Sequence, residues 1–280
     1  MTGRRKKKFE SIKTVLLYVA LIFMAFIMLI PFAWMISASL KLEKDVFSFP
    51  IVWIPEDPQW SNYKEIWQKV PLLTGFFNSI KLTVVVTVLQ FITSALAAYA
   101  FAKVNFPLKN LFFMIVLSQL MFPAQVFILP QYEMISALGK TDSLFALVFP
   151  ALVSAFGTFF LRQTYMGIPD DLLEAARIDG CGHFRSFISI AFPFTKTAMA
   201  ALAVFTALFA YGDLMWPLIV NTKLDKLTLS SGLSTLRGQF SVNYPNLMAG
   251  SVLAMIPMII IYIIFQRQFI EGIALTGTKA

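Results

Sequence analysis

The sequence predicts an all-α polytopic membrane protein with six transmembrane helices. Three observations support this fold class. The 280 residues are 58% hydrophobic and only 14% charged, whereas soluble domains carry roughly 25% charged residues. Six apolar segments are long enough to cross a bilayer, and the basic residues gather on one side of the crossings that these segments define. The composition strongly disfavours a water-soluble enzyme and excludes an intrinsically disordered chain.

The six apolar segments are the expected spans. Each has about 18 to 24 residues, and a helix of about 20 residues crosses the ~30 Å hydrocarbon layer. The first segment follows a basic cluster, as a signal peptide would, but its apolar core of about 22 residues exceeds the roughly 7–15 of a signal peptide. We therefore expect it to be retained. The segments run from Val15 to Ile36, Ser79 to Ala102, Leu111 to Leu129, Leu144 to Leu161, Ala198 to Val220 and Leu247 to Phe265.

The charge distribution predicts the orientation. With both termini in the cytoplasm, the inner side carries 14 basic and 6 acidic residues, and the outer side carries 8 of each. Cytoplasmic loops of membrane proteins have an excess of Lys and Arg. The whole net charge of +8 is therefore explained by topology, without a nucleic-acid partner.

Three connections between spans are long enough to have a function. The first outer loop, Ala38 to Phe77, is expected to contain an extended segment and then an amphipathic helix from Asn62 to Lys69 at the membrane surface. The other two are the inner loop 162–194 and the outer loop 221–246. We divide the chain into a basic cytoplasmic N-terminus (1–13), a transmembrane domain (14–268) and a cytoplasmic tail (269–280).

Motifs of catalysis and metal binding are missing from the sequence. It contains no GxxxxGK[ST], HExxH or GxSxG pattern. Cys181 is the only cysteine and His183 the only histidine, so we expect no disulfide, metal site or catalytic pair. Asp213 is the only acidic residue within the six segments, and none of them contains a histidine, which disfavours an ion-coupled carrier and a membrane-embedded hydrolase. We expect no catalytic residue and no cofactor in this chain.

The inner loop predicts two short helices below the membrane. Pro169 suits the first turn of a helix, and the two following aspartates suit its positive end. Gly180 is expected to stop this helix, and Gly182 to allow a sharp turn. A second helix should follow and end at Pro193. Its apolar residues are Phe184, Phe187 and Ile188.

The same loop resembles a known family signature. Glu174-Ala175-Ala176, then Gly180, and then Ile190 and Pro193 have the spacing of the EAA loop of bacterial ABC-importer permeases, with Phe192 at the usual Leu position. The segments WIPEDPQWSNYKEIWQ, FLRQTYMGIPDDLLEAARIDG and YGDLMWPLIV resemble carbohydrate-importer permeases of the maltose-transporter type. The tail, 269–280, is similar to that of the shorter of the two permease partners.

This resemblance implies a partner set and a location. The chain would pair with a second, homologous permease as a heterodimer in the bacterial inner membrane. Two ATPase subunits, which use ATP and Mg, would dock on the EAA loop, and an extracytoplasmic sugar-binding protein would dock outside. Glu174 would pair with a basic residue of the ATPase, and Gly180 would set the bend of the coupling helix. The residues implied in coupling are Glu174, Ala175, Ala176, Arg177, Asp179, Gly180, Ile190 and Pro193.

Polar residues in and near the spans are candidates for the solute pathway. They are Asp213, Trp216, Asn78, Gln90, Gln119 and Gln125. A solvated helix end with an interfacial tryptophan, or hydrogen bonds between helices, would explain them equally well. A sugar or oligosaccharide is the expected solute. The alternatives are another solute, such as glycerol phosphate, phosphate or an amino acid, and a membrane scaffold that transports nothing.

Overall fold

The computed structural model describes residues 2–237 and 242–277, with side chains from 13 to 237 and from 242 to 267. Within these ranges the chain is helical, apart from turns and one isolated antiparallel bridge between Arg237 and Val242. The helices form two compact units. One combines residues up to 70 with 233–255, and the other combines 71–232 with the chain from 256 onward. The predicted all-α fold class is confirmed.

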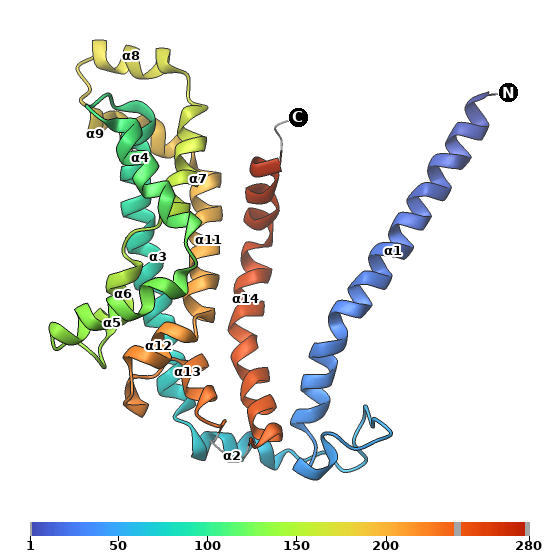
Figure 1. Cartoon of the computed structure of the whole chain (residues 1–280). Coiled ribbons are helices and arrows are strands. Elements are labelled where there is room, and N and C mark those ends of the chain that lie inside the picture. Colours follow the sequence, from blue (N-terminus) through green and yellow to red (C-terminus); the bar gives the residue numbers. More distant parts are fainter. Residues whose placement is uncertain (1, 238–241, 278–280) are drawn as a thin grey trace. The chain divides into compact units, whose positions relative to one another are not determined.

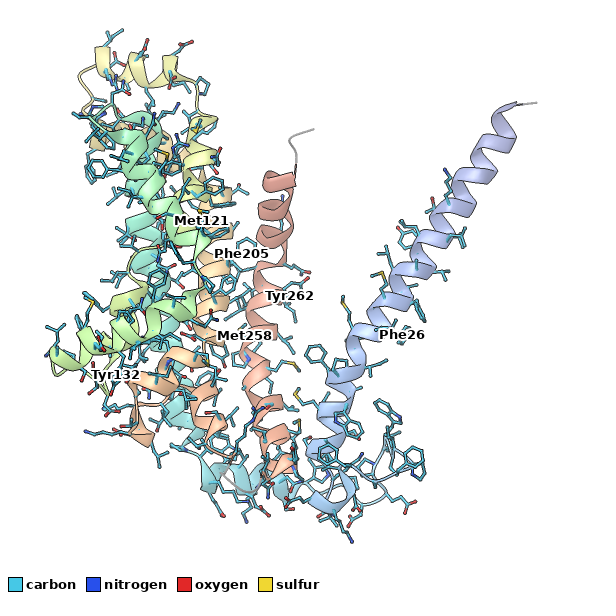
Figure 2. The ribbon with its side chains drawn as sticks, viewed as in Figure 1. Phe26, Met121, Tyr132, Phe205, Met258 and Tyr262 are labelled. Carbon is cyan, nitrogen blue, oxygen red and sulfur yellow. The ribbon has the colours of Figure 1, made fainter. Side chains whose placement is uncertain are left out.

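Helix α1 (Thr2–Ser39) is apolar on all sides through its central part. From Val15 to Ile30 the large apolar side chains are 50% to 68% exposed. Phe26 projects outward from this helix, and Tyr262 projects from the last helix, α14 (Tyr244–Gly277) (Figure 2). Such a surface requires lipid or another apolar partner around it. The side chains of the basic cluster at residues 4–8 lie outside those described.

The first outer loop is fastened to the end of α1. It contains the short helix η1 (Glu43–Asp45) and helix α2 (Ser61–Lys69). The Asn62 side-chain amide donates hydrogen bonds of 2.9 and 3.0 Å to the carbonyls of Ser39 and Lys41. The predicted amphipathic helix is thus confirmed, beginning one residue earlier than expected.

The second unit is built on three helices that lie side by side (Figure 1). These are α3 (Leu72–Lys103), α7 (Ala155–Met166) and α11 (Lys196–Gly212). Small residues allow the close approach of α3 and α7. A Cβ added at Gly157 would lie 3.1 Å from the Cβ of Ser94 and closer still to its hydroxyl. Small interfacial residues are the usual basis of helix packing in membranes.

The predicted third span is broken. Helix α4 (Lys109–Ser118) continues as η2 (Gln119–Met121), and the axis then turns by 102°. Pro123 cannot donate to a helical hydrogen bond and forces the preceding Phe122 into an extended conformation, with φ −99° and ψ 136°. The chain resumes as η3 (Ala124–Phe127) and α5 (Ile128–Ala137). A single helix from 111 to 129 was therefore a wrong expectation.

Two further spans are interrupted. The fourth consists of α6 (Leu144–Val148) and η4 (Phe149–Ala151), followed after a 45° bend by α7. The fifth is α11, which ends at Gly212, before α12 (Met215–Val220). The expected boundaries were close, but the expected continuity was wrong, because hydropathy carries no signal for a local break.

The remaining elements complete the set of six. Short helices η6 (Leu224–Lys226) and α13 (Leu229–Ser234) precede the last span, α14 (Tyr244–Gly277), which runs on through Pro257. By length and composition the described chain has three continuous spans, and six when each bent pair is counted as one. Residues 278–280, which belong to the predicted tail motif, lie outside the described residues.

Candidate functional site: helix α8 and the cavity between α3 and α11

Helix α8 (Asp170–Ile178) is the first of the two helices predicted in the inner loop. It begins directly after Pro169, with Asp170 and Asp171 in its first turn and Arg177 in its last. This charge order complements the helix dipole. The two aspartates occupy the first turn as expected, but Pro169 itself lies just outside the helix, with ψ 134°.

Gly180 ends α8 in a left-handed conformation. Its φ is +82°. Its N–H donates to the carbonyl of Arg177 at 3.0 Å, and the N–H of Cys181 donates to that of Ala176 at 2.8 Å. This pair of bonds is a Schellman cap, which requires a left-handed residue at this position. Gly182 has φ −71°, which any residue can adopt, so the turn assigned to it was a wrong expectation.

The second inner helix is a composite. It consists of α9 (His183–Ser186), a π-helical turn η5 (Phe187–Ala191) and α10 (Phe192–Phe194). The N–H of Phe192 donates to the carbonyl of Phe187, five residues back. Pro193 lies in α10, directly after the π-helical turn and near the end of the run. The helical run therefore ends beyond Pro193, not at it, and bends by 82° into α11.

The outer surface of α8 combines charged and apolar side chains. Leu173 and Ala176 are buried, whereas Glu174, Ala175, Arg177 and Asp179 are exposed. Among the large apolar residues of this loop, Leu172 is 46% exposed, Ile178 87% and Phe184 66%. Ile190 is half-buried and Pro193 exposed. Apolar side chains gathered on a polar-rimmed surface are typical of an interaction site.

Lys103 connects α8 to the last turn of α3, a contact that the sequence analysis missed. Its Nζ donates to the carbonyl of Ile168 and to Oδ1 of Asp170, each at 2.6 Å. The Lys103 side chain is only 6% exposed. Its hydrogen bond and charge hold the pKa of the Asp170 carboxyl below its ordinary value. The partners lie 65 and 67 residues away, so no local pattern could indicate them.

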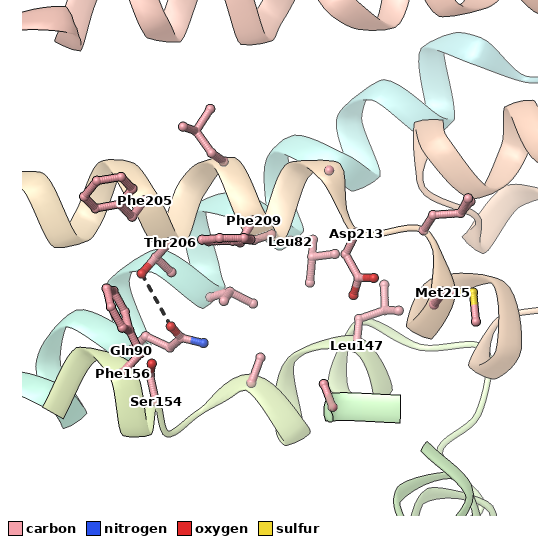
Figure 3. Close-up of a pocket in the computed structure, with 17 residues that line it drawn as sticks. Leu82, Gln90, Leu147, Ser154, Phe156, Phe205, Thr206, Phe209, Asp213 and Met215 are labelled. Carbon is pink, nitrogen blue, oxygen red and sulfur yellow. Dashed lines mark hydrogen bonds between the residues drawn. The ribbon is translucent and has the colours of Figure 1, made fainter. Parts of the chain in front are cut away.

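A cavity of about 920 Å³ lies beside the break in the fifth span (Figure 3). Its walls come from α3, α11 and the segments on either side of the 45° bend. Most of the lining is apolar, with a few polar groups from Gln90, Ser154, Thr206 and Asp213. The Thr206 hydroxyl donates to Oε1 of Gln90 at 3.4 Å. This is the composition of a typical small-molecule site.

Asp213 occupies the break itself. It follows the last residue of α11, and its carboxylate accepts hydrogen bonds from the backbone N–H groups of Met215 and Trp216. These are donors that the start of α12 would otherwise leave unsatisfied. Figure 3 shows the carboxylate directed toward Leu147. Asp213 therefore caps α12 and also lines the cavity.

The other pathway candidates lie elsewhere. Trp216 donates from Nε1 to the carbonyl of Ala146 at 2.9 Å and packs against the core. Asn78 donates to the carbonyls of Asp225 and Leu227 and borders a separate cavity of about 320 Å³. Gln119 and Gln125 are exposed and do not line the large cavity. Gln90, Thr206 and Ser154 line the large cavity together with Asp213. Thr206 and Ser154 were not predicted, and the only signal for them in the sequence is that each is a polar residue among apolar ones.

Comparison with known proteins identifies the family. A family model described as the inner membrane component of binding-protein-dependent transport systems matches residues 90–274. The chain belongs to this family. As such an inner membrane component, it is classed with transport proteins rather than enzymes.

Full-length relatives support the same assignment. This inner membrane component is 34% identical to the arabinooligosaccharides transport system permease protein of Halalkalibacterium halodurans, over 98% of its own chain and 99% of the relative. It is also 34% identical to the sn-glycerol-3-phosphate transport system permease protein of Pectobacterium atrosepticum, with 82% and 85% covered.

A solved structure has a similar fold. One chain of a bacterial ABC transporter involved in the import of the acidic polysaccharide alginate superimposes with a TM-score of 0.78 at 24% identity. The match covers 96% of this inner membrane component and 99% of that chain. The broken spans described above therefore belong to a fold already seen in an ABC transporter.

Proposed function

We propose that this inner membrane component is the permease subunit of an ATP-driven importer and forms half of the pathway for a neutral sugar or oligosaccharide. The arabinooligosaccharides permease to which it is similar along nearly its whole length supports this solute class. The alternative of a membrane scaffold without transport is disfavoured by the family itself.

The observation that carries the proposal is the cavity at the broken fifth span. Irregular backbone at membrane depth is stable only where it is buried in protein or lines a cavity, and transporters place solute sites at discontinuous helices. Here the break at Asp213 borders a cavity of about 920 Å³ with a few hydrogen-bonding groups. Hydroxyl groups of a sugar can both donate to Asp213 and bond to the Gln90 amide.

The charge of the lining favours a neutral solute over one that bears phosphate. The seventeen lining residues all lie in the described part of the chain, and none of them is Lys or Arg. A phosphate group is normally held by Arg, Lys or helix N-termini, and Asp213 would repel it. Glycerol-3-phosphate is the competing candidate solute, because a glycerol-3-phosphate transport permease is among the relatives.

Helix α8 is the proposed docking site for an ATPase subunit. Its exposed Leu172 and Ile178 offer apolar area beside the Glu174 carboxylate, the pattern of an apolar anchor with a charged rim. ATP and Mg would bind in the ATPase subunits, since this chain carries no phosphate-binding loop. A second homologous permease would complete the pathway, and an extracytoplasmic sugar-binding protein would deliver the solute.

The proposed orientation has both termini and α8 in the cytoplasm, from the excess of basic residues on that side. A cysteine placed at Arg177, in a chain with Cys181 replaced by Ser, tests it. A membrane-impermeant maleimide should label this site only after the cells are opened. Labelling in intact cells would reverse the topology.

Uptake of labelled arabinotriose by cells that carry the whole transport system tests the solute pathway. Asp213→Asn and Gln90→Ala should each reduce uptake at least fivefold at unchanged membrane abundance. Gln119→Ala is the matched control, since Gln119 is exposed and lies outside the cavity, and it should leave uptake unchanged. Strong competition by glycerol-3-phosphate, or full uptake in both cavity variants, would contradict the proposal.

A further inference from the structure

Three cationic side chains lie at the cytoplasmic end of α3, and two of them, Lys109 and Arg162, cap this end of the helix. Lys109, at the start of α4, donates from Nζ to the carbonyl of Val104 at 2.9 Å. Arg162, on α7, donates from Nε to the carbonyl of Phe101 at 3.1 Å and lies 4.2 Å above the Phe113 ring. Both bond to carbonyl groups that the end of a helix leaves without partners. The positive charge of each also interacts favourably with the negative end of the helix dipole.

Lys103 differs from these two cations, because it reaches out of α3 instead of capping it. Its ammonium bonds to the carbonyl of Ile168 and to the Asp170 carboxylate, directly before and at the start of α8. In the described part of the chain, these are the only hydrogen bonds or ion pairs through which a side chain joins this segment to α3. The Lys103 side chain is almost fully buried, whereas that of Asp170 is 76% exposed. The ion pair therefore attaches the exposed start of α8 to a buried side chain of α3.

We propose that Lys103 is a positioning residue of the importer, which makes α8 and α3 move as one body. This inference rests on the proposed function, in which α8 docks on an ATPase. A displacement of the docked helix then reaches α3, because two charge-assisted bonds of 2.6 Å resist separation better than apolar contact does. Helix α3 in turn contributes Leu82, Val86 and Gln90 to the cavity. The lysine therefore links ATPase movement to the wall of the solute pathway.

Without this link, α8 keeps its other supports. Its C-terminal cap at Gly180 is made within the loop, and Leu173 and Ala176 are buried independently of Lys103. Docking of the ATPase should therefore survive the loss of Lys103, whereas transmission should not. This separation distinguishes a positioning role from a merely structural one.

The test uses the complete transporter, purified with its ATPase and reconstituted in proteoliposomes with the binding protein and labelled arabinotriose. The readout is the number of solute molecules imported per ATP hydrolysed. Lys103→Met removes both bonds at similar length, and Asp170→Asn removes only the ion pair. Asp171→Asn is the matched control, since it neutralises the neighbouring exposed aspartate in the same helical turn. Lys103→Arg should restore most of the coupling.

The expected result is at least a fivefold loss of imported solute per ATP for Lys103→Met, with ATPase copurification within twofold of the unchanged protein. Asp170→Asn should lose less, the double variant should be no worse than Lys103→Met, and Asp171→Asn should be unaffected. An unchanged ratio for Lys103→Met, or a loss of ATPase binding that parallels the loss of import, overturns the proposal. If Lys103→Met is degraded, an unchanged ratio for the exposed Asp170→Asn overturns it equally. A transporter from which no ATPase can be copurified would instead overturn the proposed function.

Discussion

Replacement of Gly180 by alanine should weaken ATPase docking by an amount set by backbone conformation alone. The φ of +82° at this position costs a residue with a Cβ roughly 1–2 kcal/mol. A Cβ built at Gly180 meets no atom within 4 Å, so no steric term adds to this cost. If docking requires the capped end of α8, the dissociation constant of the ATPase should rise about 5- to 30-fold, since about 1.4 kcal/mol corresponds to a factor of ten.

Because a side chain at position 180 meets no neighbouring atom, its backbone conformation and not its size should determine the loss of affinity. Gly180→Leu should behave like Gly180→Ala within about twofold, and Gly180→Asn should be milder, because asparagine tolerates the left-handed region. Gly182→Ala is the matched control: Gly182 lies two residues on with equally open surroundings, but its φ is −71°.

Titration of the purified ATPase onto nanodiscs that contain the permease pair measures this effect directly. Membrane abundance should be equal for all four variants, because the Cβ of each points into open space. Wild-type affinity for Gly180→Ala would refute the conformational argument. A far larger loss for Gly180→Leu than for Gly180→Ala would show that bulk, not φ, is decisive.

Three further predictions follow from the geometry. Ile178→Asp places a charge on the most exposed apolar residue of α8, so ATPase copurification should fall at least tenfold at normal abundance; unchanged copurification would remove α8 from the interface. Gly157→Ala forces a Cβ against Ser94 and should cost about 1–3 kcal/mol by overpacking, seen as a lower melting temperature that Ser94→Ala partly restores; an unchanged melting temperature would contradict this packing. The pKa of Asp142 is lowered by N–H donors of the outer loop, the Lys223 amide first, so its stabilising bonds are complete above the unfolded value of about 3.9 and are lost as the pH falls through the lower folded value. Amide exchange at Lys223, corrected for its intrinsic pH dependence, should accelerate in that range, and a flat protection profile would contradict the assignment.

The sequence predicted elements whose determinants are local. The start of α8 follows from Pro169 and two aspartates, and its end from Gly180, because caps depend on residues within one turn. The number of spans follows from hydropathy in the same way. Gly182 shows the limit of such arguments: a glycine can occupy a conformation open to any residue, and only the dihedral angle distinguishes the two cases.

The features that the sequence could not predict depend on distant partners. The two breaks in the spans are the exception, because Pro123 and Asp213 are local causes, and a search by mean hydropathy alone passes over them. Asn78 was a reasonable pathway candidate by type, but its amide is used to hold the loop at Asp225 and Leu227, about 150 residues away. The bonds of Lys103 to α8 were missed for the same reason.

In the proposed function, this inner membrane component imports a sugar by coupling, through α8, to an ATPase. Reconstitution of the transporter, purified through a tag on this chain, tests it most directly. An ATPase and a second permease should copurify, and labelled arabinotriose should accumulate in proteoliposomes only when ATP and the loaded binding protein are both present. Accumulation without ATP, or a stable intact chain that brings down no ATPase and takes up no sugar, would contradict it.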